Sequence, residues 1–424
     1  MKKDFTSYIN SLDLSLPLKG LTKEEEKKFI EISDALYDLY KTRLKTRHYT
    51  KEAYRFEREA TTEIARYAIE LMRRTWNISG YFPFEVFNPH RIINAPAYGD
   101  RIVEQYMVEN AFKPTFTENI HEYSFACQEG KGPLLVQDYI SYALSECWEM
   151  YGEDFYILQF DIEKFFDCIS HEAAKAEFQE VGEDWYWLYE IIIDSFYVDD
   201  KYAALNDPFN PHGYGVPKGN LPSQWTGILI LNELIKEISE DEACIFDALY
   251  MDDGLVFCHM KCDCKRIKRW IDRFLKDTEM GFRLHPVKTQ YFPVSRGFTF
   301  CGRHYALNKK TGKVTITIKN ERKKCMEKRR KNLSKLVAEG KVDILTAEAV
   351  KEGQNAYLDA GLSSGRLIHY MEHHYPLPEY PLSKKEKERI KKKHTHKIPN
   401  GWKTRKDIEK KYYKAYPPVG SLGM

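Results

Sequence analysis

The 424-residue sequence lacks the long apolar segments that membrane proteins and secreted precursors carry. It contains no uninterrupted apolar run of about 18 residues, the length that a membrane-spanning helix needs. The first residues, Met1 to Asp4, do not lead into the apolar core of a secretory leader. The nine cysteines are spread from Cys127 to Cys325 without a paired framework. We therefore predict a reduced, cytoplasmic protein without a membrane partner.

A zinc site is also not favoured by the cysteine pattern. Cys258, His259, Cys262 and Cys264 are close in sequence, but they lack the second pair of ligands that structural zinc sites have. We expect these side chains at a strand end and in a loop instead.

The sequence has little net charge, +2 over the whole chain, but the charges are unevenly distributed. Residues 384–414 contain fourteen Lys or Arg and four Asp or Glu, a local charge of +10. Aromatic residues stand among these charges or just after them, namely Trp402, Tyr412, Tyr413 and Tyr416. A basic segment with interleaved aromatic residues is typical of RNA binding. His394 and His396 in the same segment lack the further partners of a metal nuclease.

The remaining composition predicts a folded protein of two or three subdomains, with 43% hydrophobic and 14% aromatic residues. Helical spacing alternates with short apolar runs, so the pattern indicates an α+β fold with antiparallel strands at its centre. We predict helices at about 20–76 (two, with a capped start near Thr22), 100–152, 171–180, 185–196, 223–240, 264–280 and 320–361, and extended segments at 81–96, 155–160, 246–257, 289–293, 297–305 and 312–318.

Three carboxylates are the candidate chemical centre. Asp252 and Asp253 stand between two short apolar runs, which predicts a tight hairpin with Asp253-Gly254 as its turn signal. Asp161 ends the apolar strand at 155–160. If that strand lies beside the hairpin, the three carboxylates meet at one sheet edge and can hold Mg²⁺. A solvated hairpin tip and a helix-capping Asp161 are the structural alternatives.

Seven segments then resemble, in family order, the polymerase blocks of reverse transcriptases, specifically of the bacterial, non-retroviral branch. They are residues 91–96 (RIINAP) and 100–104 (DRIVE) for the fingers block, 160–167 (FDIEKFFD) for motif A, 215–224 (GVPKGNLPSQ) for motif B, 250–253 (YMDD) for motif C, 285–290 (HPVKTQ) for motif D and 297–302 (GFTFCG) for motif E. Motif E departs from the more common Phe-Leu-Gly, because Cys301 stands in the middle position.

The resemblance implies a right-hand polymerase with a helical thumb. Its domains are an N-terminal helical extension at 1–78, fingers at 79–154, a palm at 155–305 with fingers-like helices at 171–200, a thumb at 306–375 and a basic C-terminal tail at 376–424. The thumb contains a Lys-rich helix, whose basic face we expect on a template–primer duplex. That face comprises Arg322, Lys323, Lys324, Lys328, Arg329, Arg330, Lys331 and Lys335, opposite a core face of Cys325, Met326, Leu333 and Leu336.

The resemblance also assigns catalytic roles. Asp161, Asp252 and Asp253 would hold two Mg²⁺ ions, with Mn²⁺ as a substitute and the carbonyl of Ile162 as a further ligand. Lys288 matches the motif D lysine that protonates or neutralises the leaving pyrophosphate.

Six residues would contact substrates. Arg91 matches the fingers residue that grips the incoming triphosphate, and Phe166 the gate that rejects a 2′-hydroxyl, with a core phenylalanine as the alternative for Phe166. The other four would lie around the nascent base pair, namely Gly219, Gln224, Tyr250 and Met251. The glycine lets the backbone approach the pair, and the glutamine begins a helix beside the template. Tyr250 and Met251 form the floor under the primer terminus.

Motif B ends in Gly-x-x-x-Ser-Gln, which resembles enzymes of diversity-generating retroelements and related enzymes of antiphage defence. The predicted function is RNA-directed DNA synthesis from a dedicated noncoding or repeat RNA in one of these two settings. Expected partners are the RNA template, nascent DNA, dNTPs, and an accessory protein or a second copy of the chain. By the same resemblance, Gln224 is a candidate determinant of misincorporation opposite template adenine.

Two other functions stay open at the level of sequence. A non-catalytic RNA-binding scaffold would be favoured by loss of a metal carboxylate, whereas Asp161, Asp252 and Asp253 are all present. Template-independent or protein-primed DNA synthesis could use a tyrosine hydroxyl, and the sequence does not distinguish it from templated copying. No integrase, RNase H, maturase or endonuclease motif is recognised.

Overall fold

The computed structural model describes residues 21–46, 51–87, 90–198, 212–278, 281–359 and 365–377. Residues 378–424 of the predicted basic tail, with Trp402, Tyr412, Tyr413 and Tyr416, lie outside the described residues, as do residues 1–20 of the expected N-terminal extension.

Two compact units make up the chain. The first unit contains residues 1–121, 162–233 and 273–283, and the second contains residues 122–161, 234–272 and 284–424. Each unit is assembled from three separate stretches, so the units group the chain differently from the predicted domains. None of the helices in the described ranges is both long and apolar enough to cross a membrane.

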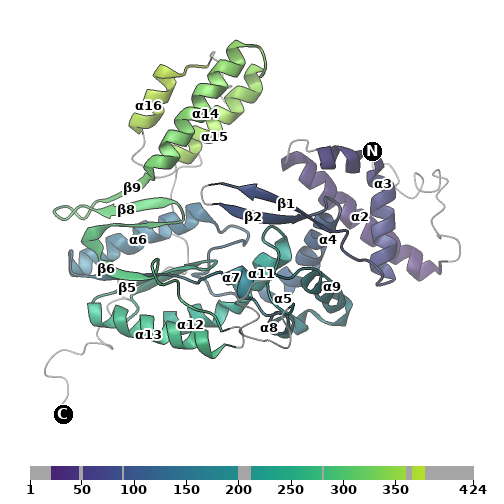
Figure 1. Cartoon of the computed structure of the whole chain (residues 1–424), viewed down its shortest axis with the longest axis horizontal. Coiled ribbons are helices and arrows are strands. Elements are labelled where there is room, and N and C mark those ends of the chain that lie inside the picture. The colour runs from purple at the N-terminus through teal and green to yellow at the C-terminus, as the bar shows by residue number, and fades with distance from the viewer. Residues whose placement is uncertain are drawn as a thin grey trace. The chain divides into compact units, whose positions relative to one another are not determined.

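The first unit is mainly helical, with one two-stranded antiparallel sheet (Figure 1). Its elements are α2 (Lys23–Thr46), α3 (Lys51–Met72), β1 (Tyr81–Val86), β2 (Arg91–Pro96), α4 (Asp100–Met107), a π-helical turn (Val108–Phe112), α5 (Lys113–Phe116), α7 (Phe165–Cys168), α8 (His171–Glu177), a 3₁₀ turn (Gln179–Val181), α9 (Glu183–Asp194) and α11 (Leu221–Ile230).

The predicted capped start of the first helix is confirmed. The amide of Glu25 donates to the Thr22 hydroxyl at 3.2 Å, and the amide of Thr22 donates to the Glu25 carboxylate at 2.7 Å. This reciprocal pair is a capping box, which satisfies two amides that the first helical turn would otherwise leave without partners.

The prediction of a single helix over 223–240 is wrong. The segment forms two helices, α11 and α12 (Asn232–Glu240), which are divided at Leu231. The Asn232 side chain explains the corner, since its carbonyl oxygen accepts from the His121 amide at 2.8 Å and its amide donates to the Asn119 carbonyl at 3.0 Å. These bonds link the start of α12 to a segment more than a hundred residues away, which the local apolar pattern does not reveal.

The second unit is built on a four-stranded antiparallel sheet with the order β4-β5-β3-β6. The strands are β3 (Tyr156–Asp161), β4 (Phe246–Tyr250), β5 (Asp253–Cys258) and β6 (Gln290–Pro293). The helix α6 (Pro133–Tyr151) lies over one face, and α12 and α13 (Lys261–Asp277) lie along the other (Figure 1). Because helices cover both faces, the central strands are almost continuously apolar and buried. The predicted mixture of helices and antiparallel strands is confirmed.

A second sheet and three helices complete this unit. The sheet has the order β7-β8-β9, and the elements are β7 (Phe298–Phe300), a 3₁₀ turn before it (Val294–Arg296), β8 (Arg303–Leu307), β9 (Val314–Ile318), α14 (Asn320–Ala338), α15 (Ile344–Asp359) and α16 (Gly365–His374). Gln159 of β3 joins the two sheets, because its side-chain amide donates to the Thr299 carbonyl of β7 at 2.8 Å.

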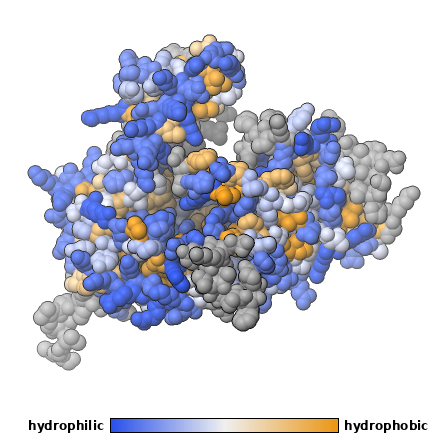
Figure 2. Space-filling model, in the orientation of Figure 1, coloured by the Kyte–Doolittle hydropathy of each residue, from blue (hydrophilic) through white to orange (hydrophobic). Residues whose placement is uncertain are grey.

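The predicted faces of α14 are partly wrong. Figure 2 shows mostly hydrophilic residues on the visible face of α14, α15 and α16, and Arg322, Lys324 and Lys328 are exposed as expected. Arg330 is fully buried instead, and Cys325 is exposed. The Arg330 guanidinium donates to Gln354 at 2.8 Å and to Asn355 at 2.9 Å, so the arginine serves as a polar core residue between α14 and α15.

Candidate active site

The hairpin of β4 and β5 has a two-residue turn formed by Met251 and Asp252, with Tyr250 paired to Asp253. The φ angle of Met251 is 57°. A side chain in this left-handed region costs about 1 kcal/mol or more, and glycine is usual at such turn positions. Backbone strain of this kind is found at functional sites, which directs attention to the two carboxylates beside Met251.

Gly254 is not a turn residue, so the expected turn at Asp253-Gly254 is wrong. Gly254 lies inside β5, directly opposite Phe160 of β3. A Cβ atom added to Gly254 would lie 2.0 Å from the Cζ atom of Phe160. The glycine therefore makes room for the buried Phe160 ring, and the close packing of β3 against β5 depends on it.

The same pairing brings two predicted metal ligands together. Asp161 is the partner of Asp253 across β3 and β5, although they are 92 positions apart in sequence. Burial raises the pKa of Asp253, and the nearby carboxylates of Asp252 and Asp161 raise it further. A hydrogen bond between the Asp253 and Asp161 carboxyl groups contributes to the same shift. These acidic groups thus favour either a shared proton or a cation.

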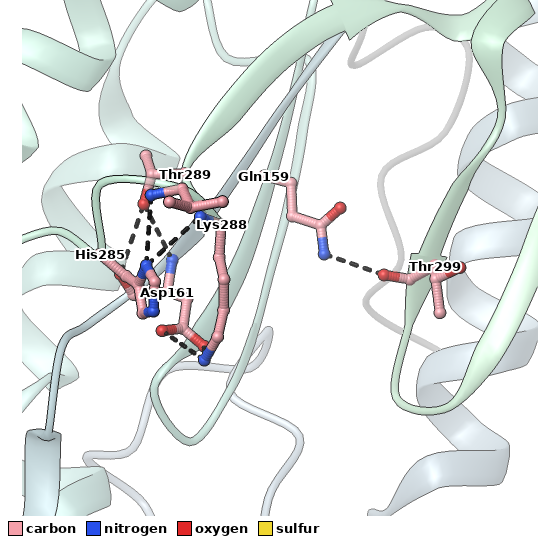
Figure 3. A network of polar contacts seen from close by, with 7 residues as sticks. Gln159, Asp161, His285, Lys288, Thr289 and Thr299 are labelled. Carbon is pink, nitrogen blue, oxygen red and sulfur yellow. Dashed lines mark hydrogen bonds and ion pairs between the residues drawn. The ribbon is translucent and has the colours of Figure 1, made fainter. Parts of the chain in front are cut away.

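Lys288 supplies one positive charge at this cluster. Its Nζ atom lies 2.8 Å from Oδ2 and 3.0 Å from Oδ1 of Asp161, as Figure 3 shows. The Asp161 side chain is 10% exposed and that of Lys288 is 58% exposed. The ammonium group therefore reaches a buried carboxylate from the solvent side.

The short turn before β6 positions Lys288 (Figure 3). The His285 amide donates to the Asp161 carbonyl at 2.8 Å, and the Asp161 amide donates to the buried Thr289 hydroxyl at 3.3 Å. The His285 Nδ1 atom accepts from the amides of Val287 and Lys288 at 3.2 and 3.4 Å. Sequence reasoning did not single out His285 and Thr289 individually, although both stand in the motif that contains Lys288.

The donor chemistry of this edge fits a divalent cation. Carboxylate oxygens are the ligands that Mg²⁺ prefers, and a cation would relieve the repulsion that raises the pKa of Asp253. Within the described ranges, no three His, Cys, Asp or Glu side chains are arranged to hold a metal ion together. Asp161 and Asp253 form a pair, and the third ligand, Asp252, stays a prediction. Ile162 follows Asp161 in the chain but belongs to the first unit, so the role of its carbonyl also stays a prediction.

Cys127 is a neighbour of the hairpin turn that the sequence did not indicate. Its Sγ atom lies 4.0 Å from the Sδ atom of Met251. The segment before Cys127 runs beside β4, since the Phe125 amide donates to the Leu249 carbonyl and the Leu249 amide donates to the Tyr123 carbonyl, both at 2.9 Å. Tyr250 is half-buried next to this turn, and burial raises its pKa to about 12.

Phe166, Gly219, Gln224 and Arg91 all lie in the first unit. Phe166 is half-buried in α7, whereas its neighbour Phe165 is buried against Phe282 with ring centres 5.1 Å apart. The core position of this turn is thus filled by Phe165, whose ring centre lies 5.3 Å from that of Phe166, and the role of Phe166 as a gate stays a prediction.

Gly219 lies against β2 of the fingers block. Its φ angle is 130°, and an added Cβ atom would lie 2.6 Å from Cγ2 of Ile93. Gln224 is half-buried in the first turn of α11, where the Asn220 side chain caps the helix by accepting from the Ser223 amide at 2.9 Å. Arg91 is exposed at the start of β2. The structure therefore brings the motif B glycine and the fingers strand into contact.

A family model described as reverse transcriptase (RNA-dependent DNA polymerase) matches residues 87–305, more than half of the chain. Among curated proteins, none matches the chain in sequence.

Solved telomerase structures are similar to the chain at low identity. Telomerase from Candida albicans, in complex with the TWJ fragment of telomeric RNA, is 12% identical with a TM-score of 0.40, and the match covers 72% of this chain and 61% of that chain. Apo telomerase from Candida tropicalis is 13% identical with a TM-score of 0.37, and the match covers 56% of this chain and 48% of that chain. The chain thus spans about half to three fifths of the length of these telomerase chains.

Proposed function

The chain belongs to the family of reverse transcriptases, the RNA-dependent DNA polymerases, and on this premise we propose that it copies a dedicated noncoding or repeat RNA into DNA by two-metal phosphoryl transfer. The observation that carries the proposal is the pairing of Asp161 with Asp253 at the end of two buried strands. A cluster of carboxylates on rigid strands holds cations in a fixed position, and fixed position is most of what phosphoryl transfer requires of a protein.

Asp161, Asp252 and Asp253, with the carbonyl of Ile162, would hold two Mg²⁺ ions, for which Mn²⁺ can substitute. When bound, these ions lower the pKa of the attacking 3′-hydroxyl and neutralise charge on the leaving pyrophosphate. Lys288 contributes a further positive charge at Asp161, which suits a group that donates a proton or a hydrogen bond to the leaving pyrophosphate.

The first unit supplies the nucleotide contacts in this proposal. Arg91 binds the incoming triphosphate from the exposed start of β2. Phe166 rejects a 2′-hydroxyl with its ring. Gly219 leaves space for the nascent base pair, and Gln224 lies beside the template. Tyr250 and Met251, from the second unit, support the primer terminus.

The predicted domains belong to the same proposal. Residues 1–78 form an extension, 79–154 the fingers, 155–305 the palm, 306–375 the thumb and 376–424 a basic tail that binds RNA. The exposed lysines and arginines of α14 contact the backbone of the template–primer duplex, so binding weakens as salt concentration rises.

The biological setting that fits motif B is a diversity-generating retroelement or an antiphage defence system of bacterial origin. The enzyme would act in the cytoplasm with its RNA and with an accessory protein or a second copy of the chain. Template-independent or protein-primed DNA synthesis, and a non-catalytic RNA-binding role, are the alternatives.

Sequencing of DNA that copurifies with the protein from cells distinguishes these functions. The variant Asp252→Ala/Asp253→Ala removes two ligands, and Glu153→Ala/Asp154→Ala is its matched control, because that adjacent acidic pair is exposed ahead of β3. We expect RNA-templated DNA with wild type and control, and none with the site variant. DNA without a template match would support template-independent synthesis, and DNA that survives the site variant would refute the proposal.

Errors at template adenines would point to diversification, and a defined or repetitive product to defence. The variant Gln224→Pro tests the predicted role of this residue in fidelity. Unchanged misincorporation opposite adenine would exclude that role.

A further inference from the structure

An ion pair in the first unit joins motif A to motif B. The Nζ atom of Lys218 lies 2.6 Å from Oδ1 and 2.7 Å from Oδ2 of Asp167. The side chain of Asp167 is 18% exposed and that of Lys218 is 34% exposed. Asp167 directly follows Phe166, so the pair is formed by the residue next to the proposed sugar gate.

Backbone hydrogen bonds hold the same two segments side by side. The Val216 amide donates to the Phe166 carbonyl at 2.9 Å, and the Gly215 amide donates to the Ile169 carbonyl at 2.8 Å. The ring Nε2 of His171 lies 2.8 Å from the Gly215 carbonyl and strengthens this contact. The main chain within α7 and directly after it is thereby attached to the extended segment that leads into Gly219.

Lys218 is also the point at which the fingers strand joins this arrangement. Its carbonyl accepts from the Asn94 amide of β2 at 2.9 Å. The next residue, Gly219, contacts Ile93 of the same strand. Lys218 therefore connects β2, which begins with Arg91, to the turn that contains Phe166.

The turn α7 requires such a connection, because a single turn of four residues is not stable by itself. Lys164 precedes it with a φ angle of 50°, and Phe165 anchors one side in the core. The half-buried Phe166 packs edge-on against this anchor, with ring centres 5.3 Å apart, so its position depends on how the turn is held. The salt bridge from Asp167, the residue directly after Phe166, ties the turn to Lys218.

We infer that the Lys218–Asp167 ion pair positions the Phe166 ring and thereby determines how strictly the enzyme selects deoxynucleotides over ribonucleotides. This inference rests on the proposed polymerase function. Lys218 and Asp167 are positioning residues, since they act through Phe166 and not by contact with the sugar.

The test compares incorporation of a dNTP and the matching rNTP by the full-length protein on its template–primer. Lys218→Met and Asp167→Asn each break the pair, and Asp167→Lys/Lys218→Asp reverses it. Phe166→Ala removes the gate. Lys113→Met is the matched control, because Lys113 forms an ion pair with Glu109 at 2.7 Å in the same unit with a similar exposure of 31%.

We expect each pair-breaking variant to lower the ratio of kcat/KM for dNTP over rNTP about fivefold, the effect of ~1 kcal/mol in the transition state. The change should come from faster rNTP use, with dNTP use nearly unchanged. The reversed pair should restore the ratio in part, and Lys113→Met should leave it unchanged. In the Phe166→Ala background, Lys218→Met should have no further effect, because the two substitutions then act on the same step.

Three results would overturn the inference. One is an unchanged ratio in variants that fold and use dNTPs. Another is loss of the thermal unfolding transition in all pair variants, which would show that the pair holds the fold and not the gate. The third is a wild-type protein that incorporates no nucleotide, which would refute the proposed function and the inference with it. The first result leaves the proposed function intact, so the two failures are distinguishable.

Discussion

The ammonium group of Lys288 contacts both carboxylate oxygens of Asp161, at 2.8 and 3.0 Å. These oxygens are the ones that a divalent cation would use. A metal ion at Asp161 would therefore compete with the lysine, because both would use the same carboxylate oxygens. A lysine released by the ion would be free to act on the leaving pyrophosphate.

Removal of this amine should strengthen metal binding. We expect Lys288→Met to bind Mn²⁺ or Mg²⁺ about tenfold more tightly. The variant lacks the ammonium charge that repels the cation, and two charges a few ångströms apart at a protein surface interact with an energy of this order. Titration calorimetry of the protein without nucleic acid measures the affinity, and Lys309→Met, an exposed lysine of the same unit, is the control. DNA synthesis should become slower in the same variant. Equal affinities in wild type and Lys288→Met would show that the lysine does not compete with the ion.

The contact between Gly254 and Phe160 predicts a large effect of one methyl group. Gly254→Ala should lower the free energy of unfolding by ~2 kcal/mol, because overpacking of a buried site costs about 1 to 3 kcal/mol. Denaturant unfolding measures the change. In a second variant, Gly254→Ala/Phe160→Leu, the smaller side chain should relieve part of the clash, so the double loss should be less than the sum of the single losses. Additive losses would mean that Phe160 is not the obstacle.

Buried carboxyl groups in α4 predict a dependence of stability on pH. Burial, followed by the charge of Asp100, raises the pKa of Glu104 from 4.5 to about 8. Burial also raises the pKa of Asp100 to about 6. The folded state therefore binds protons that the unfolded state has released, so stability falls as pH rises from about 4.5 towards 8 and is level above that range.

Glu104→Gln removes this dependence for one group. The variant should gain free energy of unfolding relative to wild type as the pH increases, and chemical unfolding at pH 6 and at pH 8.5 measures the difference. Glu109→Gln, in the following π-helical turn, is the control and should show no such trend. A variant whose stability follows the wild-type curve at both pH values would exclude Glu104 as the titrating group.

Arg330 and Arg329 are neighbours with opposite roles. Arg330→Ala should lower the free energy of unfolding by ~3 kcal/mol, because the loss of a buried cation leaves Gln354 and Asn355 without their partner. Arg329→Ala, at an exposed position, should change stability by less than about 0.5 kcal/mol. It should instead weaken binding to a template–primer duplex and reduce the salt dependence of that binding. Stability and duplex affinity measured on both variants would separate the two roles, and equal stability losses would contradict the assignment.

The sequence by itself determined the central strands and the places of the acidic residues next to them. Apolar runs of strand length identify β3, β4 and β5, and the acidic residues at or next to their ends make Asp161, Asp252 and Asp253 the predicted metal ligands. Capping signals at Thr22 and Glu25 likewise identify the start of α2. Hydrophobic periodicity and capping depend on residues within a few positions of one another, so a linear reading captures them.

Only the tertiary structure decided which of these residues meet. Gly254 looked like a turn glycine, but the Phe160 ring requires a glycine at this strand position. Arg330 looked like a surface cation and is a core residue. The helix α11 ends early because Asn232 bonds to the 119–121 segment. The contacts of Lys288 with Asp161 and of Lys218 with Asp167 join residues 127 and 51 positions apart. Such contacts depend on how distant segments pack, and no local propensity encodes them.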